Sequence, residues 1–328
     1  MSKPQINIVW LKRDLRTQDH AAFQAAENSG LPYLILFLYE PSLLSYRDAS
    51  DRHLQFCYHS IKVMNETLSK TNQEVIECYG EAKTIFEYYI ENFFVKNVFS
   101  YRESGIKETW RRDKKITKLL DSHSINWTEF QRDNILKGIK NRKNWDKIWY
   151  RTMNVPAMVN TYSNKEDLEV KNPFELSSEF IKTVENYPIS YQPAGEKNGW
   201  KYLQSFVTDR GKNYNRHISK PTESRLSCGR ISPYISWGNL SVKQASQFVV
   251  THENYPKNKR AFEGMLTRLK WHCHFIQKFE VECEYETDCL NPGYETLVHE
   301  NNKEFLVAWK QGKTGYPLID ACMRAVTQ

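Results

Sequence analysis

The segment between residues 210 and 233 concentrates side chains that could hold an anionic ligand. Residues 210–220 alternate cations with Tyr214, a composition that can bind phosphates and stack against a ring, although a solvated loop has the same composition. The sequence Ser-Arg-Leu-Ser follows at 224–227, and Ser232-Pro233 is typical of an N-cap and a first helical residue. Hydroxyls and free amides at a helix start bind anions, and a nearby arginine strengthens that binding. Such a set of donors would suit a diphosphate.

A second charged segment runs from Trp10 to His20 and reads Trp-Leu-Lys-Arg-Asp-Leu-Arg-Thr-Gln-Asp-His. Its alternating arginines and aspartates could form a fixed ion-pair network that shapes a site or docks a second domain. They could equally form a solvated charged turn, and the residues alone leave both alternatives open.

Histidines and cysteines near residue 280 lack the spacing of a metal site. His272 and His274 would point to different sides of a helix, and Cys283 and Cys289 do not have the usual gap of about 2–4 residues. We therefore expect no metal and assign these residues to structure or to a pocket wall. The chain also lacks the Gly-x-Gly-x-x-Gly fingerprint, which argues against a nicotinamide enzyme.

The composition is that of a folded, mildly basic protein. The 328 residues include 46 Lys+Arg and 39 Asp+Glu, a net charge of +7, and the 13% of aromatic residues suits either a large core or flat pockets for rings. No apolar run approaches the ~18 residues of a transmembrane helix, and charges from Lys12 onward interrupt any signal-peptide core. The seven cysteines are scattered without a C-x-x-C pair. We expect a monomer in the cytoplasm that does not bind membranes.

The first 130 residues alternate strand-like and helix-like segments, which predicts an α/β domain with a doubly wound, five-stranded parallel sheet. Ligands of such sheets bind beyond the carboxyl ends of the strands, here residues 10–16, 39–43, 79–80 and 101–104. The expected strands are 6–11, 34–39, 75–78, 96–100 and 125–130. The expected helices are 20–29, 51–69, 81–93 and 106–120.

Two further regions are expected after this domain (1–130). Residues 131–195 have weak apolar periodicity and several prolines, which indicates a long interdomain linker partly ordered around Trp145, Ile148, Trp149 and Tyr150. Residues 196–328 have helical apolar spacing, which predicts an all-α domain. Its helices are expected near 200–207, 242–250, 262–279 and 303–310, and from Pro317 onward. Because the last helical pattern is still running at Gln328, we expect this domain to be incomplete.

The most unusual stretch is 309–324, which reads Trp-Lys-Gln-Gly-Lys-Thr-Gly-Tyr-Pro-Leu-Ile-Asp-Ala-Cys-Met-Arg. Its spacing alone indicates a glycine-rich turn that enters a helix, with Asp320 and Arg324 one turn apart. Together with residues 10–20 and 224–227, however, it resembles the photolyase/cryptochrome family, and the resemblance spans essentially the whole chain.

This resemblance implies an α/β antenna domain joined by a linker to an all-helical domain that holds FAD in a folded conformation. Members of the family either repair ultraviolet-induced pyrimidine dimers in DNA or sense blue light. In repair, light excites fully reduced FAD, an electron passes to the dimer, the ring bonds split and the electron returns. We therefore expect a DNA photolyase whose partner is damaged DNA with a flipped dimer; the alternative is a cryptochrome-type photoreceptor without repair activity. Any antenna chromophore is expected in the first domain.

The resemblance also assigns site residues, although no catalytic residue. The segment that contacts the flavin phosphates corresponds to Ser224, Arg225, Leu226 and Ser227, and Tyr214 is the candidate for an upstream tyrosine. The helix that faces flavin and substrate contributes Arg268, Trp271 and Gln277 to the cofactor, and Trp271 and His274 to the substrate.

Three features depart from the family pattern. Glu223 stands where the flavin motif usually begins with Thr, and because a carboxylate would repel a diphosphate, we expect it to point away. Arg268 stands one turn before Trp271, where dimer-repairing members carry a glutamate that bonds the substrate base; this difference favours the photoreceptor. The residue that faces flavin N5, and most of the tryptophan chain for photoreduction, would follow Gln328.

Overall fold

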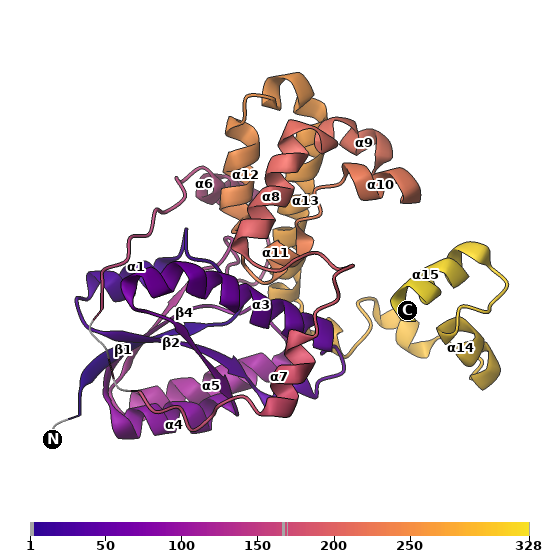
Figure 1. The fold of residues 1–328 in the computed structure, drawn as a ribbon. Coiled ribbons are helices and arrows are strands. Elements are labelled where there is room, and N and C mark those ends of the chain that lie inside the picture. Colours follow the sequence, from indigo (N-terminus) through magenta and orange to yellow (C-terminus); the bar gives the residue numbers. More distant parts are fainter. Residues whose placement is uncertain (1–2, 166–167, 169, 328) are drawn as a thin grey trace. The chain divides into compact units, whose positions relative to one another are not determined.

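The computed structural model describes residues 3–165, 168 and 170–327, and its first part is built on a five-stranded parallel sheet (Figure 1). The strand order is β3-β2-β1-β4-β5, with all four pairings parallel. The predicted doubly wound α/β fold is therefore confirmed. The strands are β1 (Gln5–Leu11), β2 (Tyr33–Tyr39), β3 (Val75–Tyr79), β4 (Phe94–Tyr101) and β5 (Asn126–Phe130).

Alternate residues of the central strands supply two separate cores. Ile6, Ile8 and Trp10 of β1 belong to the core under α4 (Ala82–Asn92) and α5 (Lys107–Ser122). Val9 and Leu11 belong to the core under α1 (Ala21–Asn28) and α3 (Asp51–Leu68). Because both faces of the sheet are covered, β2 consists of apolar and aromatic residues throughout and β1 is apolar from residue 8 to 11, which is what made these strands recognisable in the sequence.

The first helix begins one residue later than expected. His20 is its N-cap, and its Nδ1 accepts a hydrogen bond from the backbone N–H of Phe23 at 3.2 Å. A short helix, α2 (Pro41–Leu44), and a 3₁₀ turn, η1 (Ser69–Thr71), complete this part of the chain.

Between residues 131 and 195, the described part of the chain contains two helices. The first, α6 (Trp145–Met153), lies where the aromatic residues predicted order, and it buries Trp145, Trp149 and Met153. The second, α7 (Ser178–Glu185), was not predicted, and it packs against α3.

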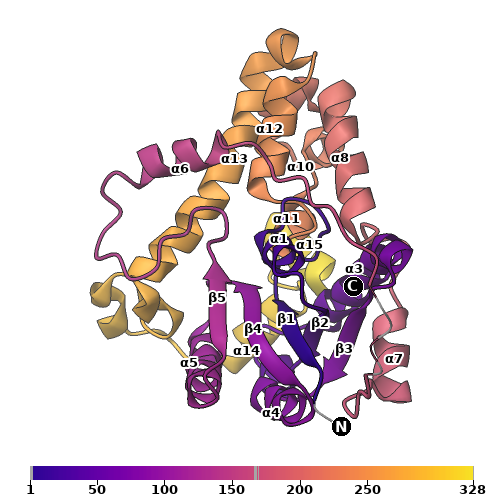
Figure 2. The same ribbon diagram turned by 90° about the vertical axis from the view of Figure 1, so that its left-hand side faces the viewer.

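Helices dominate from residue 196 onward, as expected. Figure 2 shows α8, α12 and α13 standing side by side beyond one end of the sheet. Ser241 caps α12 as predicted, whereas Ser232 is the first residue of α11 rather than its cap, which is Ile231. The elements are α8 (Glu196–Thr208), η2 (Arg210–Asn213), α9 (Tyr214–His217), α10 (Pro221–Ser227), α11 (Ser232–Ser236), α12 (Val242–Thr251) and α13 (Tyr255–Val281).

The chain divides into two compact units, residues 1–283 and 284–328. A 3₁₀ turn, η3 (Cys283–Glu286), lies at the boundary; the second unit holds η4 (Pro292–Thr296) and the two predicted helices α14 (Lys303–Lys310) and α15 (Pro317–Thr327). Asp320 ties its glycine-rich turn together, because its carboxylate accepts bonds from Thr314 N–H at 2.8 Å and from Gly315 N–H at 3.1 Å. Among the described residues, no helix has the length and apolar character needed to span a bilayer.

Candidate functional site

Three of the predicted site residues meet on one side of α13. The charged Arg268 guanidinium lies near the hydroxyl of Tyr214, which projects from α9, and stacks 4.2 Å from the centre of the Trp271 ring. Burial raises the pKa of Tyr214 above its usual value, and the charge of Arg268 opposes that rise. Tyr214 is buried whereas Trp271 is 47% exposed, so the cluster has an anchored end and an end that faces solvent.

The predicted phosphate segment, residues 224–227, forms the carboxyl end of α10 rather than a helix start. The helix dipole is negative there, so this end does not attract an anion. Arg225 and Leu226 are exposed, and the hydroxyl of Ser224 donates to the Pro221 carbonyl at 3.3 Å. Ser227 alone is buried, with its Oγ 2.7 Å from Nδ1 of His217. This geometry therefore gives Ser224, Arg225 and Leu226 no role on the inner side of the segment.

Arg230 was missed in the sequence. It adopts a left-handed backbone conformation (φ 55°), and its Nε is buried and finds no hydrogen-bond partner among the described residues. Its guanidinium lies 5.8 Å from the centre of the Tyr202 ring. The signal was present, because Arg230-Ile-Ser repeats the Arg–apolar–Ser order of residues 225–227 directly before Pro233.

Arg210 holds the backbone between α10 and Arg230. Its Nη1 donates to the Cys228 carbonyl at 2.6 Å and its Nη2 to the Tyr202 carbonyl at 2.9 Å. Gly229 is buried, and a side chain there would press against Met265 of α13. The segment 228–230 is therefore fixed between α8 and α13, close to the side of α13 that carries Arg268.

Two other predicted residues lie elsewhere along α13. Gln277 is fully buried, and its amide bonds the Leu136 carbonyl at 2.9 Å and the Leu136 N–H at 2.6 Å. This pairing fastens α13 to residues 131–144, so the geometry does not support the predicted contact of Gln277 with a cofactor. His274 accepts a hydrogen bond from Arg142 Nη1 at 2.9 Å, and burial, followed by the charge of Arg142, lowers its pKa. It too faces the segment before α6.

The charged segment between Trp10 and His20 is a fixed network, which decides between the two alternatives of the sequence. Asp14, Arg16 and Asp19 are all buried. Arg16 donates to the carbonyls of Asp19 at 2.8 Å and Gly238 at 3.1 Å, so it joins the end of β1 to the turn before α12.

A cavity of about 250 Å³ lies at the carboxyl ends of β1 and β2, at the predicted ligand edge of the sheet. Arg13 stacks 4.6 Å from the Trp237 ring in its wall. Arg112 bonds Glu40 and Glu103 at 2.8 Å each. Burial alone would raise the pKa of Glu103, but Arg112, Arg13 and Lys12 hold it at about 2. The cavity therefore combines aromatic walls with charges that are already paired.

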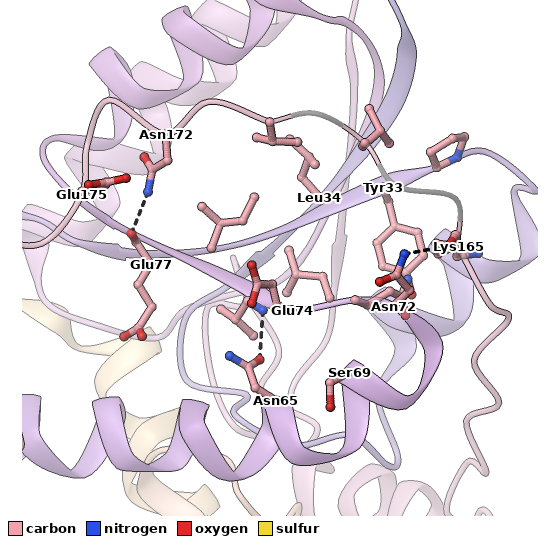
Figure 3. A pocket seen from close by; sticks show the side chains of 17 residues that line it. Tyr33, Leu34, Asn65, Ser69, Asn72, Glu74, Glu77, Lys165, Asn172 and Glu175 are labelled. Carbon is pink, nitrogen blue, oxygen red and sulfur yellow. Dashed lines mark hydrogen bonds between the residues drawn. The ribbon is translucent and has the colours of Figure 1, made fainter.

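A second cavity, of about 730 Å³, lies along the outer strand β3 (Figure 3). Asn172 and Asn72 both line this cavity. Asn172 donates to the Glu77 carbonyl at 3.0 Å, and Asn72 donates to the Lys165 carbonyl at 3.1 Å. These bonds hold Asn172 and Lys165 near an edge strand, where they help to protect its free backbone groups from pairing with another chain.

Two family models of known proteins match separate parts of the chain. Residues 7–152 match the family model for DNA photolyase, and residues 265–328 match that for the FAD binding domain of DNA photolyase. The deoxyribodipyrimidine photo-lyase of Buchnera aphidicola is 25% identical over 351 residues, which cover 99% of this chain and 70% of that protein.

Two solved structures share the fold. A cryptochrome from Synechocystis matches with a TM-score of 0.82 and 19% identity, over 100% of this chain and 72% of its own. An archaeal photolyase from Sulfolobus tokodaii, solved with two FAD molecules, matches with a TM-score of 0.77 and 20% identity, over 98% of this chain and 70% of its own. Because both family models match parts of the chain and the relatives cover nearly all of it, the chain belongs to the photolyase/cryptochrome family.

Proposed function

We propose that the protein binds FAD and uses blue light to repair pyrimidine dimers in DNA. The observation that carries the cofactor assignment is the unpartnered Nε of Arg230. A buried donor without a partner costs about 1–3 kcal/mol unless a ligand atom completes it. A diphosphate supplies such oxygens, and Arg268 and Tyr214 add further donors, so the residues present fit the FAD diphosphate.

In this assignment each residue has a separate task. Bound reduced FAD would supply, when excited by light, the electron that splits a dimer. Arg230 and Arg268 balance the charge of the diphosphate, and Tyr214, which lies near Arg268, helps to orient it. Trp271 is half-exposed and offers an aromatic surface to a base that has left the DNA stack.

An antenna chromophore is proposed for the cavity between Arg13, Trp237 and the ends of β1 and β2. Its volume of about 250 Å³ suits one ring system, and its aromatic walls suit a flat one. The archaeal photolyase with two FAD molecules supports a second pigment in a protein of this fold.

The second candidate is a blue-light photoreceptor without repair activity. Arg268 favours it, because its guanidinium covers the Trp271 ring at the position where dimer-repairing members carry a glutamate. The relatives include proteins named cryptochrome as well as photolyases, at similarly low identity.

The deciding experiment begins with protein purified in the dark. Absorption of bound flavin in the blue supports the cofactor assignment, and a colourless protein that does not take up added FAD contradicts it. The reduced holoprotein is then illuminated with an oligonucleotide that contains one pyrimidine dimer. Restoration of the undamaged strand supports the photolyase, and an unchanged lesion beside an intact flavin spectrum supports the photoreceptor.

Other sequence-based expectations remain predictions. They comprise the division into residues 1–130, 131–195 and 196–328, the monomeric state, and a location in the cytoplasm. The predicted location in the cytoplasm agrees with the seven cysteines, which are all free thiols.

A further inference from the structure

The guanidinium of Arg210 spends its hydrogen bonds on neutral acceptors. Its Nε donates to the Ser205 hydroxyl at 3.0 Å, and its two Nη atoms donate to four backbone carbonyls at 2.6 to 3.4 Å. These carbonyls belong to Tyr202, Leu226, Cys228 and Gly229. In the described part of the chain, no carboxylate pairs with Arg210. Because a guanidinium is a rigid planar fork of donors, it fixes residues 226–229 in one position relative to α8.

Arg230 is therefore held through its backbone on both sides. The carbonyls before it are bound by Arg210, and its own carbonyl accepts a hydrogen bond from Gln192 Nε2 at 2.5 Å. Arg230 adopts the left-handed conformation (φ 55°), which a residue with a long side chain keeps only where its surroundings impose it. The direction of the Arg230 side chain, with its unpartnered Nε, thus depends on Arg210 and Gln192.

The two arginines also lie close to each other. Their guanidiniums are 5.9 Å (Arg210) and 5.8 Å (Arg230) from the centre of the same Tyr202 ring. Burial is the main cause that lowers the pKa of Arg210, and the charge of Arg230 lowers it further. Two like charges without an acid between them repel each other, and an anion bound at Arg230 would offset this repulsion.

We propose that Arg210, together with Gln192, is a positioning residue for the diphosphate of the flavin. Neither residue contacts the ligand; both hold Arg230 in the conformation in which its free Nε meets a phosphate oxygen. This inference deepens the proposed function and rests on it. A residue that acts only through Arg230 has no effect on the ligand once Arg230 is gone, so a double-mutant cycle separates positioning from an independent contribution.

The test measures the FAD affinity of the full chain in the dark, from the change in flavin fluorescence when FAD is added to apoprotein. The variants are Arg210→Lys, Arg230→Gln and the two together. Lysine keeps the charge of Arg210 but lacks the planar fork that reaches several carbonyls. The matched control is Arg16→Lys, because Arg16 also donates to two backbone carbonyls, those of Asp19 and Gly238. Urea unfolding of each apoprotein records its stability.

Arg210→Lys and Arg230→Gln should each weaken FAD binding about tenfold, and the double variant should bind no more than about twofold more weakly than Arg230→Gln alone. The control should change FAD affinity by less than about twofold, even if its stability falls. Losses that multiply to about a hundredfold in the double variant would overturn the proposal, as would an unchanged affinity of Arg210→Lys or an equal loss in the control. If Arg210→Lys does not fold, Gln192→Met replaces it in the same cycle, since it removes only the amide that bonds the Arg230 carbonyl.

A second measurement needs no flavin. Inorganic pyrophosphate has the same charged group as the FAD diphosphate. It should raise the thermal unfolding midpoint of the parent apoprotein and of Arg16→Lys, but not that of Arg210→Lys or Arg230→Gln. A protein that pyrophosphate stabilises in this pattern but that takes up no FAD would refute the proposed flavin function and support the role of Arg210. Bound FAD with losses that multiply would refute only the role of Arg210, so the two proposals fail separately.

Discussion

The Lys243 ammonium lies 2.7 Å from the Asp19 carboxylate, and this pair joins the first turn of α12 to the turn that follows β1. The second carboxylate oxygen of Asp19 accepts a hydrogen bond from the Ser241 hydroxyl at 2.6 Å. Asp19 also accepts from the Met158 N–H at 2.9 Å. One buried carboxylate thus connects its own turn to two segments that each lie more than a hundred residues further along the chain.

Replacing Asp19 by Asn should destabilise the protein by about 2–4 kcal/mol, because Lys243 would lose its partner in a largely buried place. Asn tolerates the left-handed backbone at this position (φ 55°), so the lost stability would come from the missing carboxylate charge and not from backbone strain. Urea unfolding measures the effect. Adding Lys243→Met to the Asn variant should cost much less than adding it to the parent; equal costs would show that the two residues do not interact.

The buried pair of Asp14 and His20 should make the protein sensitive to acid. Their side chains lie 2.9 Å apart, and burial is the main cause that lowers the pKa of His20 below its usual 6.5. The unfolded chain therefore takes up a proton at a higher pH than the folded chain, so stability falls as pH drops below about 6.5. Burial alone would raise the pKa of Asp14, but His20 and nearby charges lower this pKa. The stability that the ionised Asp14 contributes is therefore also lost in acid.

The variant His20→Gln isolates this effect. It should be less stable than the parent at about pH 7.5, because Gln cannot reproduce both the Phe23 hydrogen bond and the Asp14 contact of the imidazole, but its stability should depend less on pH between about 7.5 and 5.5. Urea unfolding at several pH values gives the slope. A slope identical to that of the parent would assign the acid sensitivity to other histidines.

Glu77 is expected to change the stability with pH in the direction opposite to that of the Asp14–His20 pair. Burial raises its pKa to about 7, against the bond that it accepts from the Tyr39 hydroxyl at 2.7 Å. The folded chain therefore binds a proton that the unfolded chain has released between about pH 4.5 and 7, and stability is lost as pH rises through this range. Glu77→Gln should stabilise the protein by about 1–3 kcal/mol at pH 8 and by little at pH 5. Thermal unfolding at both pH values measures the difference, and equal shifts would contradict the raised pKa.

The strands could be predicted from the sequence, but helix α7 could not, and the reason is physical. Strands β1 and β2 are buried on both faces, so their sequences contain continuous apolar runs. Helix α7 has eight residues and buries only Val184, so its own sequence carries little signal. Its stability comes from α3, where Gln55 donates to the Thr183 carbonyl at 2.9 Å and Lys62 pairs with Glu185 at 3.1 Å. Local periodicity does not report such distant partners.

The candidate site was predictable in its residue types but not in its exact positions. Tyr214, Arg268 and Trp271 were found because the family resemblance points to their helices, and the structure brings them together. Two Arg–apolar–Ser sequences follow one another five residues apart, however, and composition does not tell which arginine has a buried side-chain nitrogen. That distinction depends on where α10 ends and the chain turns toward Met265.

The two arginines therefore give a matched test of the flavin segment. Arg230 has a buried donor without a partner, whereas Arg225 is exposed at the end of α10. Arg230→Gln should weaken FAD affinity about tenfold or more, because it removes a charge-assisted bond worth about 1.5–3 kcal/mol, while Arg225→Gln should leave it unchanged. The ratio of flavin to protein absorbance after gel filtration measures retention. If Arg225→Gln or Ser227→Leu releases the flavin and Arg230→Gln does not, the phosphates lie at residues 224–227 as the sequence first indicated, and the left-handed turn at Arg230 has only a structural role.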